Sequence, residues 1–276
     1  MVKALGLLTT LFFLCRSMHA FTLNNNIAAA FRNDEVLINV ASHNCDNIGV
    51  TNSELLILIE EAVTTYWNRV HTSRLRLKKG SIIDVSSGVS DPFQTDLACS
   101  NSPDSNCQIN EDLKVSNDIL VACNVNSDNF SNNPSSVVGV TIPNNINGTN
   151  IVGALILVND IPGNSFESLG RNEKIAVLAH EIGHAIGLGH SQLNQNLMYF
   201  QSISTRRGLG FDDVDGITYL YPVEQPFGGC GTIGFQKNTD GSNNTFTSFL
   251  FFLVALMITL LMGRFPKFLR KEKIWE

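Results

Sequence analysis

The segment from His180 to His190, which reads H-E-I-G-H-A-I-G-L-G-H, constrains the fold of this chain more than any other feature. Residues four apart on a helix lie one turn apart on the same face, so His180 and His184 can present two imidazoles to one metal ion. Gly187 can adopt the left-handed conformation that ends a helix, after which His190 can return as a third ligand. One face of this helix is apolar, which predicts that the helix packs in a core. The residues of that face are Ile175, Leu178, Ala179, Ile182 and Ile186.

Three histidine nitrogens would fill three positions of a tetrahedral zinc ion and leave the fourth for water, which is the arrangement of a catalytic site. Glu181 lies on an adjoining helix face and is expected to reach that water without displacing it. Two other interpretations are a zinc ion held only for folding and histidines that simply form hydrogen bonds. The open position and Glu181 favour the catalytic interpretation.

This segment resembles the metzincin metalloproteases and, within them, the matrixins. Ser191 directly after the third histidine is typical of matrixins, and Met198 in N-L-M-Y matches the methionine turn beneath the metal. Leu209–Tyr221 looks like the last helix of the family. The resemblance covers about residues 34–222, and its specific part is 180–199. It is closest to a bacterial-type matrixin without a cysteine-switch propeptide, because the first expected strand begins about fifteen residues after the expected signal peptide.

The resemblance implies an α/β (α+β) catalytic domain with a twisted, mostly parallel sheet of about five strands and about three helices. It implies a zinc-dependent endopeptidase with one catalytic Zn²⁺, in which Glu181 takes a proton from the attacking water and returns it to the leaving amine. An extended peptide would pair with the edge strand, which we expect at Val137–Ile142, through Val138, Gly139 and Val140. Calcium sites of Asp and backbone carbonyls are compatible with the family, but the sequence does not locate them.

Two alternatives remain open at this point. One is a non-catalytic zinc-containing domain that binds peptide or a surface polymer, against which Glu181 argues. The other is a peptidase that acts on a single self-derived protein.

The chain departs from animal matrixins in several places. Phe200, which follows the methionine turn, starts a segment unlike theirs, so the shape of the specificity pocket does not carry over. Outside the motif and the expected signal peptide only His43 and His71 remain, too few for a second, structural zinc, and we expect both to be solvated or hydrogen-bonded. Asp212 and Asp213 have two interpretations: a solvated helix start, or, as the resemblance implies for some matrixins, an Asp that binds the ammonium group of the mature N-terminus, which would be Phe21.

Periodicity predicts the other elements of the domain. Expected strands are Glu35–Ala41, Leu75–Leu77, Ser81–Val85, Ile119–Ala122, Val137–Ile142 and Ile151–Asn159, the last two joined by a turn-rich Pro143–Asn150. Expected helices are one from a Ser53 cap to about Val70, one over Glu173–Gly187 capped by Asn172, and one over Asp212–Leu220.

The two ends of the chain are predicted to direct its location. Met1–Ala20 has a basic start, an apolar run and a small residue before the expected cut, as in a secretory signal peptide. Phe246–Gly263 is an uncharged run of 18 residues, long enough for a C-terminal transmembrane helix. The basic tail 264–276 would then be cytoplasmic and the catalytic domain, 21–221, outside.

Residues 222–245 are rich in Gly, Asn and Ser, and we interpret them as a linker. Within this linker, Gly228–Thr232 followed by an apolar run and basic residues also resembles the C-terminal sorting signals of some bacterial exported proteins. A processed anchor is therefore the alternative to a retained one.

Four cysteines in the body are consistent with export and allow three pairings into two disulfides. We expect Cys99 to pair with Cys107 and Cys45 with Cys123. Cys230 remains as an odd cysteine in the linker.

The charge of the body excludes one class of partner. Residues 21–245 hold 12 basic and 23 acidic side chains, a net charge of −11. Such a surface repels phosphate, so we expect no nucleic acid as a partner.

Overall fold

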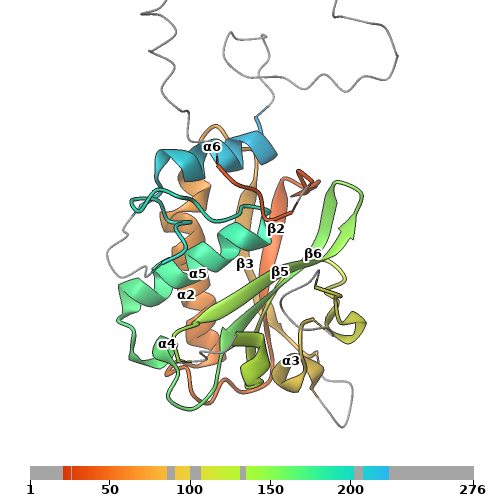
Figure 1. Ribbon diagram of the computed structural model, residues 1–276, viewed down its shortest axis with the longest axis vertical. Coiled ribbons are helices and arrows are strands. Elements are labelled where there is room, and N and C mark those ends of the chain that lie inside the picture. The colour runs from red at the N-terminus through yellow and green to blue at the C-terminus, as the bar shows by residue number, and fades with distance from the viewer. Residues whose placement is uncertain are drawn as a thin grey trace, which may run out of the picture. The chain divides into compact units, whose positions relative to one another are not determined.

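The computed structural model describes residues 21–25, 27–85, 91–99, 107–130, 135–201 and 208–223. At the centre of this part of the chain lies a mixed sheet of six strands (Figure 1). Its strands are β1 (Ala30–Phe31), β2 (Glu35–Ala41), β3 (Arg76–Ile83), β4 (Asp118–Asn124), β5 (Gly139–Asn147) and β6 (Asn150–Asn159). The α-helices are α2 (Asn52–Thr65), α3 (Pro92–Thr95), α4 (Ser165–Ser168), α5 (Arg171–Ala185) and α6 (Phe211–Leu220). Three 3₁₀ turns lie at Trp67–Arg69, Glu111–Leu113 and Ser127–Phe130.

The sheet is parallel except at one edge. Strands β3, β2, β4 and β6 are neighbours in that order, and β1 pairs with the start of β6. Strand β5 runs antiparallel to β6, which is its one pairing partner among the described strands. The expected mixed α/β fold with a mostly parallel sheet is therefore confirmed, and β5 is the edge strand.

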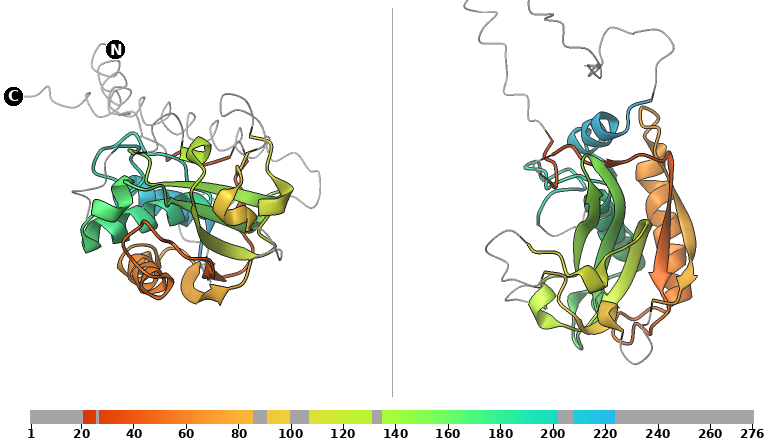
Figure 2. Two further views of the ribbon diagram at one scale, coloured as in Figure 1. Left: turned by 90° about the horizontal axis from the view of Figure 1, so that it is seen from below. Right: turned by 90° about the vertical axis from the view of Figure 1, so that its right-hand side faces the viewer.

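Alternating side chains of the central strands separate two hydrophobic cores. In β4, Ile119 and Val121 face the core that contains α2 and α5, whereas Leu120 faces a second core covered by α3 and loops. In β6, Ile156 and Leu157 divide in the same way. Figures 1 and 2 show α2 and α5 together on one face of the sheet. This arrangement presses α5 against the sheet beside β5.

The helix starts differ from the expected ones because other residues form the caps. Helix α2 is capped by Thr51, not Ser53, in a capping box: the Thr51 hydroxyl accepts from the Glu54 N–H, and the Glu54 carboxylate accepts from the Thr51 N–H at 2.8 Å. The helix also ends earlier, at Thr65 rather than near Val70. Helix α5 is capped by Gly170 instead of Asn172, and its start is fixed by a glutamate three residues after the cap.

Two expected interruptions of strands are wrong, because β3 and β5 each continue through a shift in register. The two strands expected between Leu75 and Val85 form one strand, β3, in which the Asn39 amide oxygen accepts from the Ser81 N–H at a register shift. The expected turn at Pro143–Asn150 is mostly strand. Pro143 lies at a shift in the β5–β6 register, where an edge strand tolerates a missing donor, and the hairpin turns at Gly148 (φ 61°).

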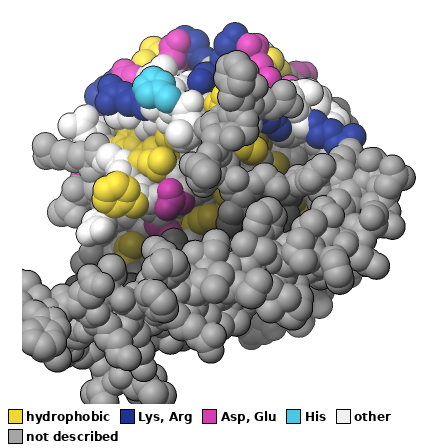
Figure 3. Space-filling view, turned by 90° about the horizontal axis from the view of Figure 1, so that it is seen from above, with side chains coloured by type: hydrophobic (Ala, Val, Ile, Leu, Met, Phe, Trp, Pro, Cys, Tyr) yellow, Lys and Arg dark blue, Asp and Glu magenta, His cyan; other side chains and the backbone are white. Residues whose placement is uncertain are grey.

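Charged side chains mix on the surface. On the face in Figure 3, Lys and Arg lie among Asp and Glu rather than in a patch of one sign. Among the described residues, Lys78 and Glu35 form an ion pair at 2.5 Å.

None of the described helices is both long enough and apolar enough to cross a membrane. The expected signal peptide, membrane span and tail, Cys230 and all of the linker after Val223 lie outside the described residues.

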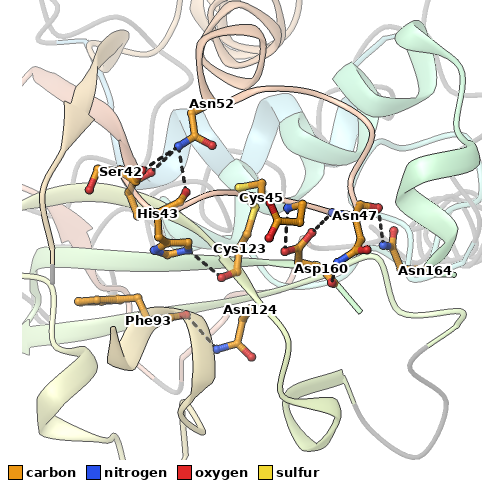
Figure 4. The surroundings of a disulfide bond; sticks show 12 residues. Ser42, His43, Cys45, Asn47, Asn52, Phe93, Cys123, Asn124, Asp160 and Asn164 are labelled. Carbon is orange, nitrogen blue, oxygen red and sulfur yellow. Dashed lines mark hydrogen bonds between the residues drawn. A yellow bond between two sulfur atoms is a disulfide. The ribbon is translucent and has the colours of Figure 1, made fainter. Parts of the chain in front are cut away.

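Two disulfides stabilise the loop side of the sheet, in the pairing that the sequence suggests. Cys45–Cys123 joins the loop after β2 to the end of β4 across 78 residues, and Cys99–Cys107 closes a loop of 8. Beside the first, the Asp160 carboxylate accepts from the Asn47 N–H at 2.6 Å (Figure 4). The His43 ring bridges Asp91 and the Cys123 carbonyl, so this histidine is hydrogen-bonded as expected.

We predict unequal losses of stability from removing the two disulfides. Replacing Cys45 and Cys123 by Ala should lower the free energy of unfolding by about 4.5 kcal/mol, against about 2.5 kcal/mol for Cys99 and Cys107, because the longer loop restricts the unfolded chain more. Denaturant unfolding of both double variants measures the difference. Equal losses would contradict the loop-length explanation.

Candidate metal centre

Helix α5 carries the first two histidines through the buried centre of the domain. The Trp67 indole N–H donates to the Ala179 carbonyl at 2.8 Å, and nearly every residue of the second half of the helix is buried. Gly183 lets other groups approach the helix closely, since a Cβ there would lie 2.3 Å from the Met198 sulfur and 2.8 Å from the Trp67 ring. The helix is therefore fixed in both position and rotation.

The end of α5 turns the chain back toward the histidines. Gly187 has φ of 105°, and its N–H donates to the His184 carbonyl at 3.0 Å. The Leu188 N–H donates to the Gly183 carbonyl at 3.0 Å, which completes a Schellman motif. A side chain at position 187 would also come within 2.6 Å of the Ala29 carbonyl. Glycine is thus required here for its conformation and for space.

The three predicted histidines converge. One ring nitrogen from each of His180, His184 and His190 lies within 4.8 Å of the other two, and they form the one group of at least three potential metal ligands among the described residues. The first two rings are buried and the third is exposed. This is a site with a protein-facing side and an open side.

The hydrogen bonds of the rings suit a metal ion. His180 Nδ1 lies 2.7 Å from the Leu197 carbonyl and His184 Nδ1 lies 2.8 Å from the Leu188 carbonyl. A carbonyl only accepts, so each Nδ1 carries a proton and each Nε2 is the unprotonated nitrogen, which is the form that coordinates a metal. Nε2 of His184 and Nε2 of His190 are 3.2 Å apart. Tetrahedral zinc with Zn–N bonds of about 2.05 Å would separate its nitrogens by about 3.3 Å, so the donor set fits zinc.

The surroundings of His184 and His190 favour the neutral form of both rings. Burial lowers the pKa of His184, and burial together with the neighbouring His184 lowers the pKa of His190. Lower values favour the neutral imidazole, which is the form that binds metal.

Glu181 lies beside the histidines in the same cleft. Its carboxylate is buried, and burial raises its pKa to about 7, although a hydrogen bond from Thr141 and the charge of His190 act in the opposite direction. A carboxyl with a pKa near neutrality can both accept and release a proton, as a general base requires.

The methionine turn lies under α5 and is held from both sides. The Met198 carbonyl accepts from the Ser191 N–H at 2.7 Å, and the Asn196 amide donates to the Ser191 hydroxyl at 2.7 Å. Because the Leu197 carbonyl accepts from His180, the turn also orients one histidine ring.

Asp213 fixes this turn, and sequence reasoning missed it. Asp212 and Asp213 are both buried, so the expected solvated helix start is wrong. The Asp213 carboxylate accepts from the N–H groups of Leu197 at 2.7 Å, Met198 at 3.1 Å and Gly210 at 2.8 Å. Burial raises its pKa even though these three donors oppose the change.

A second missed element is the segment 22–24, which pairs with the loop that carries the third histidine. The Asn24 N–H donates to the Gly187 carbonyl and the Gly189 N–H to the Thr22 carbonyl, both at 2.9 Å. The Thr22 hydroxyl donates to the His190 carbonyl. Nothing in the composition of this segment indicates that role, since the contacts span more than 160 residues.

A cleft of about 550 Å³ opens between these parts. Its lining includes residues 22–24, residues 139–141 of β5, the three histidines and Glu181. Of the residues expected on the substrate-binding strand, Gly139 and Val140 begin β5 and line the cleft. Val138 just precedes β5, and its carbonyl accepts from the Asn159 N–H at 3.2 Å.

Comparison with known proteins points to one family. Residues 125–222 match the matrixin family, Peptidase M10. A similar protein is metalloendoproteinase 2-MMP of Arabidopsis thaliana, 34% identical over 102 residues, which are 31% of this chain and 27% of that protein. Another is human matrix metalloproteinase-19, 44% identical over 52 residues, which are 18% of this chain and 10% of that protein. The match thus spans about a quarter of the first relative and a tenth of the second.

We predict that Asp213→Asn disturbs the methionine turn. An amide in place of the carboxylate puts a donor against backbone donors, so stability should fall by about 2 kcal/mol and zinc should bind more weakly. Thermal unfolding and zinc titration measure both effects. Asp215→Asn, an exposed change on the same helix, is the matched control and should alter neither. Wild-type values for Asp213→Asn would contradict the assigned role.

Proposed function

The chain is a matrixin-like metzincin, with its matrixin segment at residues 125–222, and we propose that it is a zinc-dependent endopeptidase. One observation carries the proposal: three imidazoles converge within 4.8 Å in a cleft that also contains a buried carboxylate. His180, His184 and His190 would hold the metal, and the donor chemistry of their rings fits zinc. A purely binding domain has no use for a base at that place.

When bound, zinc would supply Lewis-acid chemistry, polarising the scissile carbonyl and making water easier to deprotonate. Glu181 accepts a proton from the attacking water and later gives it to the leaving amine, so no covalent intermediate with the protein forms. The Leu188 and Leu197 carbonyls hold the tautomers of His184 and His180, and Asp213 holds the turn that supplies one of these carbonyls.

An extended peptide would bind along β5. Strand β5 is an edge strand, and its first residues line the cleft. Free backbone groups of an edge strand can pair with a substrate strand, which gives affinity for the peptide backbone irrespective of its sequence. This favours a peptide or protein substrate.

We further propose that the catalytic domain is exported and tethered through residues 246–263, with sorting-signal processing as the alternative. The two disulfides among the described residues support an oxidising compartment outside the cytoplasm. Protease treatment of intact cells, with blotting for the two ends of the chain, tests this placement.

The central experiment is zinc quantification together with peptide-library cleavage by the full-length chain, with and without a chelator. About one zinc per chain and chelator-sensitive cleavage are expected. Zinc without cleavage would favour the non-catalytic binding domain, and cleavage that persists in chelator would contradict a metal-dependent mechanism.

We predict that Glu181→Gln keeps zinc but reduces peptide cleavage by about 10³-fold or more, because the amide cannot accept the proton. Zinc content and kcat/KM measure the two effects. His190→Ala is the complementary variant and should weaken zinc binding itself. If Glu181→Gln cleaves as well as the parent, Glu181 is not the base.

A further inference from the structure

The side chain of Thr141 touches the proposed base directly. Its hydroxyl lies 2.6 Å from Oε2 of Glu181 and donates to that oxygen when the carboxyl is ionised. The two residues are 40 positions apart and belong to different elements, β5 and α5. The bond therefore connects the strand proposed to bind substrate with the group proposed to move the proton.

The first residues of β5 lie against the side chain of Glu181. Residues 139 and 141 are two apart and so project from the same face of the strand, while Val140 packs against the second core on the other face. A Cβ on Gly139 would lie 3.3 Å from both Cγ and Cδ of Glu181, which is tighter than ordinary contact. Gly139 thus leaves room for the glutamate side chain, and Thr141 supplies a donor beyond it.

A general base needs this kind of support because its geometry is demanding. Glutamate has three side-chain torsions, and a base acts only when its oxygen is within hydrogen-bond reach of the proton it takes. A donor that occupies Oε2 fixes the plane of the carboxylate and restricts Oε1 to one direction. The rings of His180 and His184 do not depend on this bond, because the Leu197 and Leu188 carbonyls orient them.

We propose that Thr141 is a positioning residue that sets the orientation of the Glu181 carboxylate for proton transfer. This inference rests on the proposed endopeptidase function and adds to it a residue that acts through Glu181 rather than on the metal or the substrate. The side-chain hydroxyl, rather than the backbone of the strand, carries the role.

Three variants of the full-length, zinc-loaded chain test the inference. Thr141→Val removes the hydroxyl at nearly constant volume, Thr141→Ser restores it, and Thr64→Val removes a hydroxyl from an exposed site on α2 as a matched control. Thr141→Val should lower kcat roughly 10- to 100-fold, with KM within about twofold and zinc content unchanged. Thr141→Ser should recover kcat to within about threefold, and Thr64→Val should match the parent.

Several results would overturn the inference. They are an unchanged kcat in Thr141→Val, a loss that appears in KM or in zinc content, or a failure of serine to rescue. Circular dichroism and thermal unfolding of each variant distinguish a local change from misfolding, and a Thr141→Ser variant that is folded but inactive counts against the role of the hydroxyl.

Crystal structures of the zinc-loaded parent and Thr141→Val provide a readout that does not depend on activity. We expect one Glu181 rotamer in the parent and a displaced or divided carboxylate in the valine variant. An identical carboxylate in both would refute positioning by Thr141. If the parent binds zinc but cleaves no peptide, the proposed function fails, while these structures still decide whether Thr141 orients the glutamate.

Discussion

The turn at Gly187 is the constraint on which the candidate metal centre depends. Helix α5 ends at Ala185, one residue after His184, and the turn then reverses the chain. The Leu188 carbonyl thereby returns to the ring of His184, and His190 comes close to the same ring. The Schellman hydrogen bonds and the close approach of Ala29 leave space for glycine only. Without this reversal, a helix with two histidines would have no third donor.

Sequence reasoning was strongest where chemistry is local. The spacing of His180 and His184 follows from the period of a helix, and the alternation of Glu35–Ala41 gave a strand with the bounds that the structure shows. Glycine at 187 signals a helix end by its own conformational freedom. The two disulfides were the expected ones among three pairings, since one joins cysteines only eight residues apart.

The supporting residues could not be found in this way, because their roles come from distant partners. Thr141, Asp213 and Thr22 look like ordinary strand, helix-start and loop residues, yet each contacts the centre across at least 15 residues of sequence. Similarly, Asn39 bridges a register shift in β3, which the pattern of apolar residues could only present as an interruption. Tertiary packing determines these contacts, and the pattern of residues along the sequence does not predict it.

The late position of Asp213 in the chain has a consequence for synthesis. The turn around Met198 receives hydrogen bonds from a carboxylate on the last described helix, so the centre is incomplete until that helix has been made and has docked. A growing chain that already includes its three histidines would still lack the hydrogen bonds that order the methionine turn. If the chain is a peptidase, this order of assembly protects the unfinished polypeptide from premature self-digestion.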